Sequence, residues 1–187
     1  MVNKREETTK TKDEYAVVLD IIVESGKSFK DKEFIQAIGT KYFTLLELVP
    51  KEGVSIIPSQ KVYIGDGKRD EILYIKRALP INKLSGSSKS ELLYAIEEIV
   101  KERESEFVDF FNKAGPVTIR KHSLESIPGI GKKHLQELLE SREDKPFESF
   151  DDIKERCDFL PNPSNAIAQR IKTEMEGEAE RNLFVMR

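Results

Sequence analysis

Cysteine and tryptophan are nearly missing from this chain of 187 residues, which has one cysteine, Cys157, and no tryptophan. A single cysteine cannot form a disulfide within the chain, and it provides no thiolate cluster for zinc. Such low cysteine usage is typical of proteins in a reducing compartment. We therefore expect a cytoplasmic protein whose fold depends on neither disulfides nor structural metal.

Long apolar runs are also missing. No uninterrupted apolar stretch approaches the roughly 20 residues that a membrane-spanning helix requires. Residues 1–12 are polar and charged, without the apolar segment of a signal peptide. These features predict a flexible N-terminal tail and no membrane partner.

Charge is abundant but nearly balanced. Charged residues make up 35% of the chain, against roughly 25% in an average globular protein, and the net charge is −3. This balance argues against a protein that coats nucleic acid by bulk attraction. Residues 61–83 nevertheless hold six basic and three acidic side chains. Such a local excess is compatible with selective, modest nucleic-acid binding.

The first part of the sequence has the pattern of a small β domain. Residues 15–23 and 42–49 are rich in β-branched and aromatic side chains, and Pro50 ends the second run. Residues 34–38 fit a short helix or a bent strand. Asp66-Gly67 lies between two further apolar runs and predicts a hairpin, because both residues tolerate positive φ. We expect an α+β protein that begins with an OB-like antiparallel β-barrel over residues 13–83.

The middle of the chain is predicted to be a linker and a long connecting helix, residues 84–115. Ser88 and Glu91 have the spacing of a capping box. Apolar residues then recur at helical spacing, and three phenylalanines among them, at 107, 110 and 111, are expected in the core. Gly115-Pro116 ends this pattern.

Short helical segments that contain an internal repeat follow. Residues 127–131 (Ile-Pro-Gly-Ile-Gly) align with residues 160–164 (Leu-Pro-Asn-Pro-Ser). Two copies of one helix–turn–helix unit would form a compact bundle over residues 116–176. Residues 177–187 form a C-terminal tail, in which Leu183-Phe184-Val185 is an apolar patch that docks either on the body of the protein or on a partner.

The first copy has the residues of a phosphate-binding turn: Gly129, Ile130, Gly131, Lys132 and Lys133. The glycines allow a sharp reversal and let the backbone approach a ligand closely. The following helix presents its free N–H groups and the positive end of its dipole at the turn. The lysines add positive charge. Such a site contacts phosphate and not bases, so no sequence preference is expected. In the alternative interpretation the turn merely joins two packed helices.

This pattern resembles the helix-hairpin-helix motif of DNA repair and recombination proteins, and residues 124–171 are similar to its tandem form. The resemblance implies that the main-chain amides at residues 129–131 hold a phosphate, sometimes with a monovalent cation on the hairpin carbonyls. Two positions depart from the family pattern. Leu135 replaces a small residue, and Pro163 in the second copy lacks an N–H. We therefore expect only the first hairpin to bind phosphate.

Several strings together resemble an uncharacterised archaeal family over nearly the whole chain. They are Val62-Tyr63-Ile64-Gly65, Lys68-Arg69-Asp70, the segment 107–112 and the segment 127–133. The resemblance implies an OB-like barrel joined to a tandem helix-hairpin-helix, and a role as a predicted nucleotide- or RNA-binding protein. On this ground RNA is favoured over DNA.

A second nucleic-acid surface is predicted on the barrel and before the first hairpin. OB-folds hold single strands on aromatic side chains surrounded by basic ones. In the alternative interpretation the aromatics, which include Phe43 and Tyr74, are core and the basic residues form a solvated edge. The candidate residues are Lys61, Tyr63, Lys68, Arg69, Lys76, Arg77, Arg120 and Lys121.

Catalysis has little support in the sequence. There is no Ser/His/Asp set, no Cys/His cluster and no glycine-rich nucleotide loop, and Asp151-Asp152 is better explained by helix capping than by a metal site. The two histidines, His122 and His134, are expected to be surface residues. We expect a non-catalytic nucleic-acid-binding protein. The alternative is a protein-interaction adaptor that docks on a larger nucleic-acid-processing complex.

Overall fold

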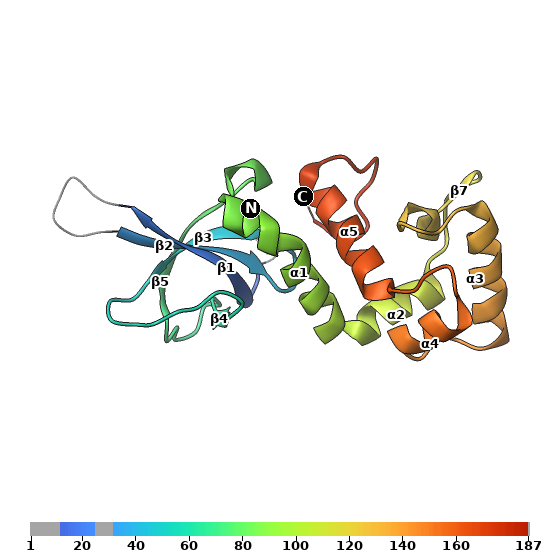
Figure 1. Cartoon of the computed structure of the whole chain (residues 1–187), viewed down its shortest axis with the longest axis horizontal. Coiled ribbons are helices and arrows are strands. Elements are labelled where there is room, and N and C mark those ends of the chain that lie inside the picture. Colours follow the sequence, from blue (N-terminus) through green and yellow to red (C-terminus); the bar gives the residue numbers. More distant parts are fainter. Residues whose placement is uncertain (1–11, 25–31, 187) are drawn as a thin grey trace, which may run out of the picture. The chain divides into compact units, whose positions relative to one another are not determined.

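The computed structural model describes residues 12–24 and 32–186, and the chain divides into two compact units, residues 1–80 and 81–187. The architecture is mixed α+β (Figure 1). Of the tail predicted for residues 1–12, all but Lys12 lies outside the described residues.

The first unit is a curled antiparallel sheet, a half-barrel. Its order is β4-β1-β2-β3-β5. The inner faces of the strands bury a continuous apolar core that includes Val18, Ile35, Leu48 and Ile72. The strands are β1 (Tyr15–Glu24), β2 (Lys32–Gly39), β3 (Leu45–Pro50), β4 (Lys61–Tyr63) and β5 (Ile72–Ala78). Residues 34–38 therefore belong to a strand.

The hairpin predicted around Asp66-Gly67 is wrong. β4 pairs with β1 and β5 pairs with β3, so the two segments lie at opposite ends of the sheet order. The connecting loop instead wraps around Tyr63, whose hydroxyl accepts a hydrogen bond from the Gly67 amide at 3.1 Å. A Cβ on Gly65 would stand 2.4 Å from that hydroxyl oxygen, so any other residue at this position would require the Tyr63 ring to shift.

The strand predicted over 42–49 begins three residues later than expected. Phe43 has a left-handed φ of 57°, which is incompatible with a strand. The preceding turn is held by the buried Asp13 carboxylate, whose Oδ1 accepts hydrogen bonds from the amides of Lys41 (2.7 Å) and Tyr42 (2.9 Å). Phe43 is buried, which confirms the core interpretation for this aromatic residue.

The second unit contains, within the described residues, five α-helices and a short β-ribbon. The α-helices are α1 (Gly86–Glu102), α2 (Glu104–Lys113), α3 (Lys132–Asp144), α4 (Phe150–Arg156) and α5 (Pro163–Glu176). The ribbon pairs β6 (Pro116–Thr118) with β7 (Lys121–His122). Two 3-10 turns, η1 (Ile81–Lys83) and η2 (Ser123–Ser126), complete the unit. The expectation that the chain after Pro116 is entirely helical is therefore wrong.

The single long helix predicted between residues 84 and 115 is broken at Arg103. The Arg103 guanidinium folds onto the first turn of α2, where it binds the Glu106 carboxylate at 2.6 and 3.0 Å and lies over the Phe107 ring. The predicted linker is also shorter, because α1 begins at Gly86. Ser85 caps α1 by accepting a hydrogen bond from the Ser88 amide at 2.9 Å, and Ser88 itself is buried.

The C-terminal tail docks on the body of the second unit. Gly177 ends α5 with a left-handed φ of 78°. The chain then returns so that the Phe184 ring lies 5.5 Å from that of Phe107 and 4.9 Å from that of Phe110. Leu183-Phe184-Val185 is therefore packed within the protein.

Glu47 links β3 to the edge strand β5. Its carboxylate lies 2.5 Å from the Lys76 ammonium and 2.9 Å from the Arg77 guanidinium, and its side chain is only 10% exposed. Burial alone would raise the pKa of Glu47, but the hydrogen bonds and charges of Lys76 and Arg77 outweigh it, so the pKa lies below 4.5.

We predict that Glu47→Gln lowers the free energy of unfolding of the sheet by about 1–3 kcal/mol at neutral pH, because two cations lose their buried partner. A lowered pKa contributes stability above the unfolded value of 4.5, and this contribution disappears as the pH falls through the folded value. The difference between the two proteins should therefore shrink below pH 4.5. Hydrogen exchange of the β3 and β5 amides measures it.

The matched control is Asp66→Asn, which breaks the exposed Lys12–Asp66 pair of 3.2 Å in the same unit. Exposed pairs contribute little to stability. Equal losses in the two variants would contradict the role assigned to Glu47.

Candidate nucleic-acid interface

The first hairpin is a tight turn between η2 and α3. Ile127 and Ile130 are buried, and the Ile130 amide donates to the Ile127 carbonyl at 3.1 Å. Gly129 has a φ of 91°, which L-residues with side chains rarely adopt. Ile130 thus anchors the turn as the sequence predicts. The element before the turn is only a 3-10 turn and not an α-helix.

The start of α3 leaves amides free at the surface. Gly131 is the N-cap, with extended backbone and no side chain to cap the helix. The first backbone bond runs from the Leu135 amide to the Gly131 carbonyl. Within the described part of the chain, the amides of Gly131, Lys132 and Lys133 have no acceptor. They remain available to an anion.

Space is open beside Gly131 at the start of this helix. A Cβ placed on Gly131 would meet no atom within 4 Å. An open groove of about 550 Å³ runs along the hairpin and is lined beyond it by Glu125, Ser126, His134, Arg170 and Thr173. The groove therefore reaches Gly131, the residue at which α3 begins.

The two lysines of the motif are unequally engaged. Lys132 is exposed and has no ion-pair partner among the residues that the structure describes. Lys133 is 87% exposed and lies 3.6 Å from Glu137, one turn further along α3. Such a helix-surface pair is weak, so both ammonium groups can turn toward a ligand at the helix start.

His134 has a role that the sequence did not indicate. Its Nδ1 lies 2.8 Å from the Gly129 carbonyl oxygen, and its ring stacks on Phe159 with centroids 4.3 Å apart and planes within 5°. Phe159 directly precedes the second hairpin. Leu160, the first residue of the second hairpin, has its Cδ1 3.5 Å from the position of a Cβ on Gly129. The second hairpin thus supports the shape of the first. The position of Phe159 beside the internal repeat was the available signal.

Carbonyl groups of the first hairpin already accept hydrogen bonds from the protein. The Ser126 carbonyl accepts from the Arg170 guanidinium and the Ile127 carbonyl from the Ile130 amide. The Gly129 carbonyl accepts from the His134 ring. One of these donors, Arg170, is itself a cation. A monovalent cation at the hairpin would share these carbonyls with the protein donors through their second lone pairs.

The second hairpin has its helix start filled by a carboxylate from α1. Asn162 caps α5 by accepting from the Asn165 amide at 3.1 Å. The Glu97 carboxylate accepts hydrogen bonds from Asn165 Nδ2 at 2.7 Å and from Ser164 Oγ at 3.3 Å. An internal anion thus lies where a phosphate would approach, which gives a physical reason to expect no phosphate at this copy.

Arg120 and Lys121 lie on the β6–β7 ribbon before the hairpin. The Arg120 amide donates to Thr118 Oγ1 at 3.2 Å, so the residue is part of the ribbon turn. The Lys121 ammonium is paired with Glu180 of the C-terminal segment at 2.5 Å. His122 is half-buried, and its ring caps η2 by accepting a hydrogen bond from the Leu124 amide.

In the first unit the predicted surface residues lie on two strands that do not pair with each other. Lys61 and Tyr63 belong to β4 and Lys76 and Arg77 to β5, at opposite ends of the sheet order. Lys76 and Arg77 are bound to Glu47, and the Arg69 Nε donates to the Gly65 carbonyl within the loop at 2.9 Å.

A smaller aromatic and basic group remains on β1 and β4. The Tyr15 and Tyr63 rings meet edge to face at 5.3 Å, and the Lys61 ammonium lies over the Tyr15 ring at 5.6 Å. Tyr15 was not among the residues that the sequence predicted for a nucleic-acid surface. Lys68 lies exposed in the neighbouring loop, and Tyr74 is exposed on β5.

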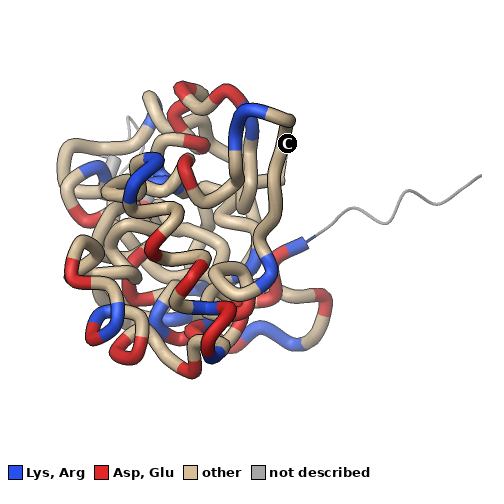
Figure 2. Tube along the Cα trace, turned by 90° about the vertical axis from the view of Figure 1, so that its right-hand side faces the viewer, with Lys and Arg blue, Asp and Glu red and all other residues tan. Residues whose placement is uncertain are grey.

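Basic and acidic residues alternate along the chain. Figure 2 shows basic and acidic stretches interspersed along the trace. Within residues 12–24 and 32–186, no cluster of three or more His, Cys, Asp or Glu side chains could hold a metal ion. The same residues contain no helix that is long and apolar enough to span a membrane.

The chain belongs to a family of proteins of unknown function, DUF655, whose model matches residues 12–186. It is 40% identical over 171 residues to the uncharacterized protein MJ0038 of Methanocaldococcus jannaschii, covering 91% of this chain and 78% of that protein. The crystal structure of Af1531 from Archaeoglobus fulgidus, a protein of the same family, superposes with a TM-score of 0.85 at 37% identity. That match covers 93% of this chain and all of the other. The predicted resemblance to an uncharacterised archaeal family is thus confirmed at the level of the family.

The carboxylate at the second hairpin has a testable energetic signature. Burial raises the pKa of Glu97, but hydrogen bonds from Asn165 and Lys101 outweigh this effect, so the pKa lies below 4.5. We predict that Glu97→Ala destabilises the helical unit by about 1.5–3 kcal/mol at neutral pH, as expected for hydrogen bonds to a charged group. The loss should diminish as the pH falls below 4.5, because the lowered pKa contributes stability only above that range.

Urea unfolding, monitored by the far-ultraviolet circular dichroism of the helices, measures this loss. Glu98→Ala is the control, since Glu98 is the next residue on α1 and binds only Lys101 among the described side chains. Comparable losses in both variants would show that Glu97 does not anchor the start of α5.

Proposed function

We propose that this protein binds the sugar–phosphate backbone of nucleic acid through its first hairpin, without catalysis. The observation that carries the proposal is the uncapped start of α3, where the amides of Gly131, Lys132 and Lys133 have no acceptor in the described part of the chain and Gly131 lines the hairpin groove. The helix dipole and two exposed lysines act at the same point. A phosphate oxygen would provide the acceptors that these amides lack.

The proposal assigns the two hairpins of a tandem helix-hairpin-helix domain to different tasks. The first binds phosphate, and the second supports it through the stack of Phe159 on His134. Contacts to main-chain amides and lysines read the backbone and not the bases, so binding should be independent of sequence. We favour RNA over DNA as the ligand, and both belong in the test.

The apolar residues of the C-terminal tail do not support the adaptor alternative. Leu183, Phe184 and Val185 donate their amides to Glu174 at 2.8–2.9 Å, and Phe184 packs on two other phenylalanines. The patch that would have docked on a partner is used inside the second unit.

We predict that Lys132→Glu/Lys133→Glu weakens binding to labelled duplex DNA, single-stranded RNA and stem–loop RNA by at least about tenfold at low salt. Two phosphate contacts are lost, so the slope of log affinity against log salt should become shallower by roughly 0.9 per contact on duplex DNA. Fluorescence anisotropy across a salt series measures both quantities.

The control is Lys89→Glu/Lys154→Glu, which makes the same change in net charge at two exposed positions of the same unit away from the groove. A further arm, Lys68→Glu, tests the first unit. If the two double variants bind alike, the hairpin is not the contact surface. If the wild-type protein binds none of the probes at low salt, direct nucleic-acid binding is wrong and the adaptor becomes the better explanation.

At Gly131 a single substitution should change the stability of the protein and its affinity for nucleic acid in opposite directions. Gly131→Ser places a preferred N-cap on backbone that is already extended, and its hydroxyl can accept a hydrogen bond from an amide in the first turn. We expect the variant to be more stable, by a few tenths of a kcal/mol, and to bind nucleic acid more weakly, because the serine occupies an amide that phosphate would use. Thermal unfolding and anisotropy on the same sample test both. A variant with unchanged affinity would show that these amides are not the phosphate site.

A further inference from the structure

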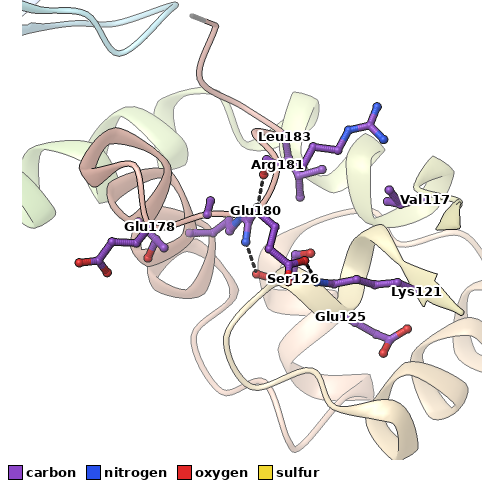
Figure 3. Close-up of a pocket in the computed structure, with 11 residues that line it drawn as sticks. Val117, Lys121, Glu125, Ser126, Glu178, Glu180, Arg181 and Leu183 are labelled. Atoms are coloured by element: carbon purple, nitrogen blue, oxygen red, sulfur yellow. Dashed lines mark hydrogen bonds and ion pairs between the residues drawn. The ribbon is translucent and has the colours of Figure 1, made fainter.

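A second cavity adjoins the hairpin groove and is partly covered by the C-terminal segment. It has a volume of about 310 Å³ and is lined by β7, η2, α5 and residues 178–183 (Figure 3). Four of its lining residues, Glu125, Ser126, Arg170 and Thr173, also line the hairpin groove. The two depressions are therefore adjacent, and a chain bound at the hairpin could continue toward Lys121.

The backbone around this cavity is firmly held. Glu174 is fully buried, and its carboxylate accepts the amides of Leu183, Phe184 and Val185 and the Arg170 Nε at 2.9 Å. Arg170 also donates to the Arg181 carbonyl at 2.5 Å and to the Ser126 carbonyl at 3.3 Å. Because a buried ion pair with satisfied hydrogen bonds is hard to break, the arch of residues 178–182 has fixed ends.

The acidic side chain at the top of this arch is, by contrast, loosely held. Glu180 is 83% exposed, and its Oε2 lies 2.5 Å from the Lys121 ammonium. Its pKa is lowered, first by the hydrogen bond from Lys121 and then by its charge, so the carboxylate is ionised at neutral pH. Exposed pairs of this kind exchange partners easily.

We infer that Glu180 occupies, in the free protein, the position of a nucleic-acid phosphate on Lys121. This inference rests on the proposed function and extends it. A strand held at the hairpin amides would place a second phosphate at Lys121, and that phosphate must displace the carboxylate. Glu180 therefore competes with the ligand, while the anchored backbone stays in place.

The inference also restricts the class of ligand. A phosphate at the hairpin and another at Lys121 belong to one phosphodiester chain, so a polynucleotide is the ligand and a mononucleotide is a poor one. An internal carboxylate on Lys121 further disfavours weak, nonspecific attraction of small anions, because each must first replace Glu180.

The test measures the affinity of the full chain for labelled stem–loop RNA and duplex DNA at low salt. Glu180→Gln should tighten binding roughly two- to fivefold, the range expected when an exposed ion pair no longer competes. Lys121→Ala should weaken binding. In the double variant Lys121→Ala/Glu180→Gln, the gain from removing Glu180 should vanish, because the carboxylate acts only through Lys121.

Glu178→Gln is the matched control. It removes the same charge from the same arch, lines the same cavity, and Figure 3 shows its side chain directed away from Lys121. Equal gains from Glu178→Gln and Glu180→Gln, or an undiminished gain in the double variant, would overturn the inference in favour of a general charge effect.

The hairpin variant keeps the two proposals distinguishable. If Lys132→Glu/Lys133→Glu abolishes binding while Glu180→Gln and Glu178→Gln behave alike, the hairpin site stands and the competition by Glu180 is wrong. If the hairpin variant binds as the wild type does, the proposed function fails, and this inference fails with it.

Discussion

Each α-helix begins with backbone N–H groups that have no acceptor within the helix, and the organisation of the second unit follows from how these groups are satisfied. Ser85, Ser149 and Asn162 cap α1, α4 and α5 with their side chains. α2 follows directly on α1, and the amides of Glu106 and Phe107 in its first turn donate to the Arg103 carbonyl. α3 begins at a glycine with no cap. The same requirement is thus met inside the protein elsewhere and left to solvent or a ligand at the first hairpin.

The contrast between the two hairpins has the same origin. At the second, the Glu97 carboxylate meets the start of α5, and an anion supplied by α1 joins two helices of the same unit. At the first, no carboxylate among the described residues accepts a hydrogen bond from the amides. The two copies of an internal repeat can therefore have different roles. One copy uses the start of its helix for packing, and the other leaves the start of its helix accessible. Phe159 and Leu160 make the packed copy a support for the accessible one, since Phe159 stacks on His134 and Leu160 lies beside Gly129.

The hairpin could be predicted from the sequence because its determinants are local. Two glycines, the buried isoleucine and the lysines lie within five residues, and their spacing alone implies the turn. The errors lie where distant segments decide the outcome. Asp66-Gly67 has a strong local preference for a hairpin, yet β4 pairs with β1 and β5 with β3 because these pairings bury the sheet's apolar face. The break at Arg103 is a departure of the backbone from helical geometry, with φ −106° and ψ 27°, which no residue type in the pattern indicates.

The contacts that shape the candidate site are the least predictable, since they join residues far apart in the sequence. Glu97 reaches Asn165 across 68 positions and Lys121 reaches Glu180 across 59. Neither hydrophobic periodicity nor secondary-structure propensity predicts such pairs. In the sequence, Lys76 and Arg77 look like exposed basic residues available to a ligand. In the structure both are paired with Glu47, which precedes Arg77 by 30 positions.

Burial separates two kinds of ion pair in the second unit, and this difference bears on how the site could work. Arg170–Glu174 is enclosed, shares its oxygens with three amides and joins α5 to both the C-terminal segment and the hairpin. Removing one partner would strand a buried charge, so this pair sets the geometry. Lys121–Glu180 is exposed and can open without disturbing any fold contact. A rigid frame that carries one weak, replaceable ion pair beside an uncapped helix is suited to exchanging an internal carboxylate for an external phosphate.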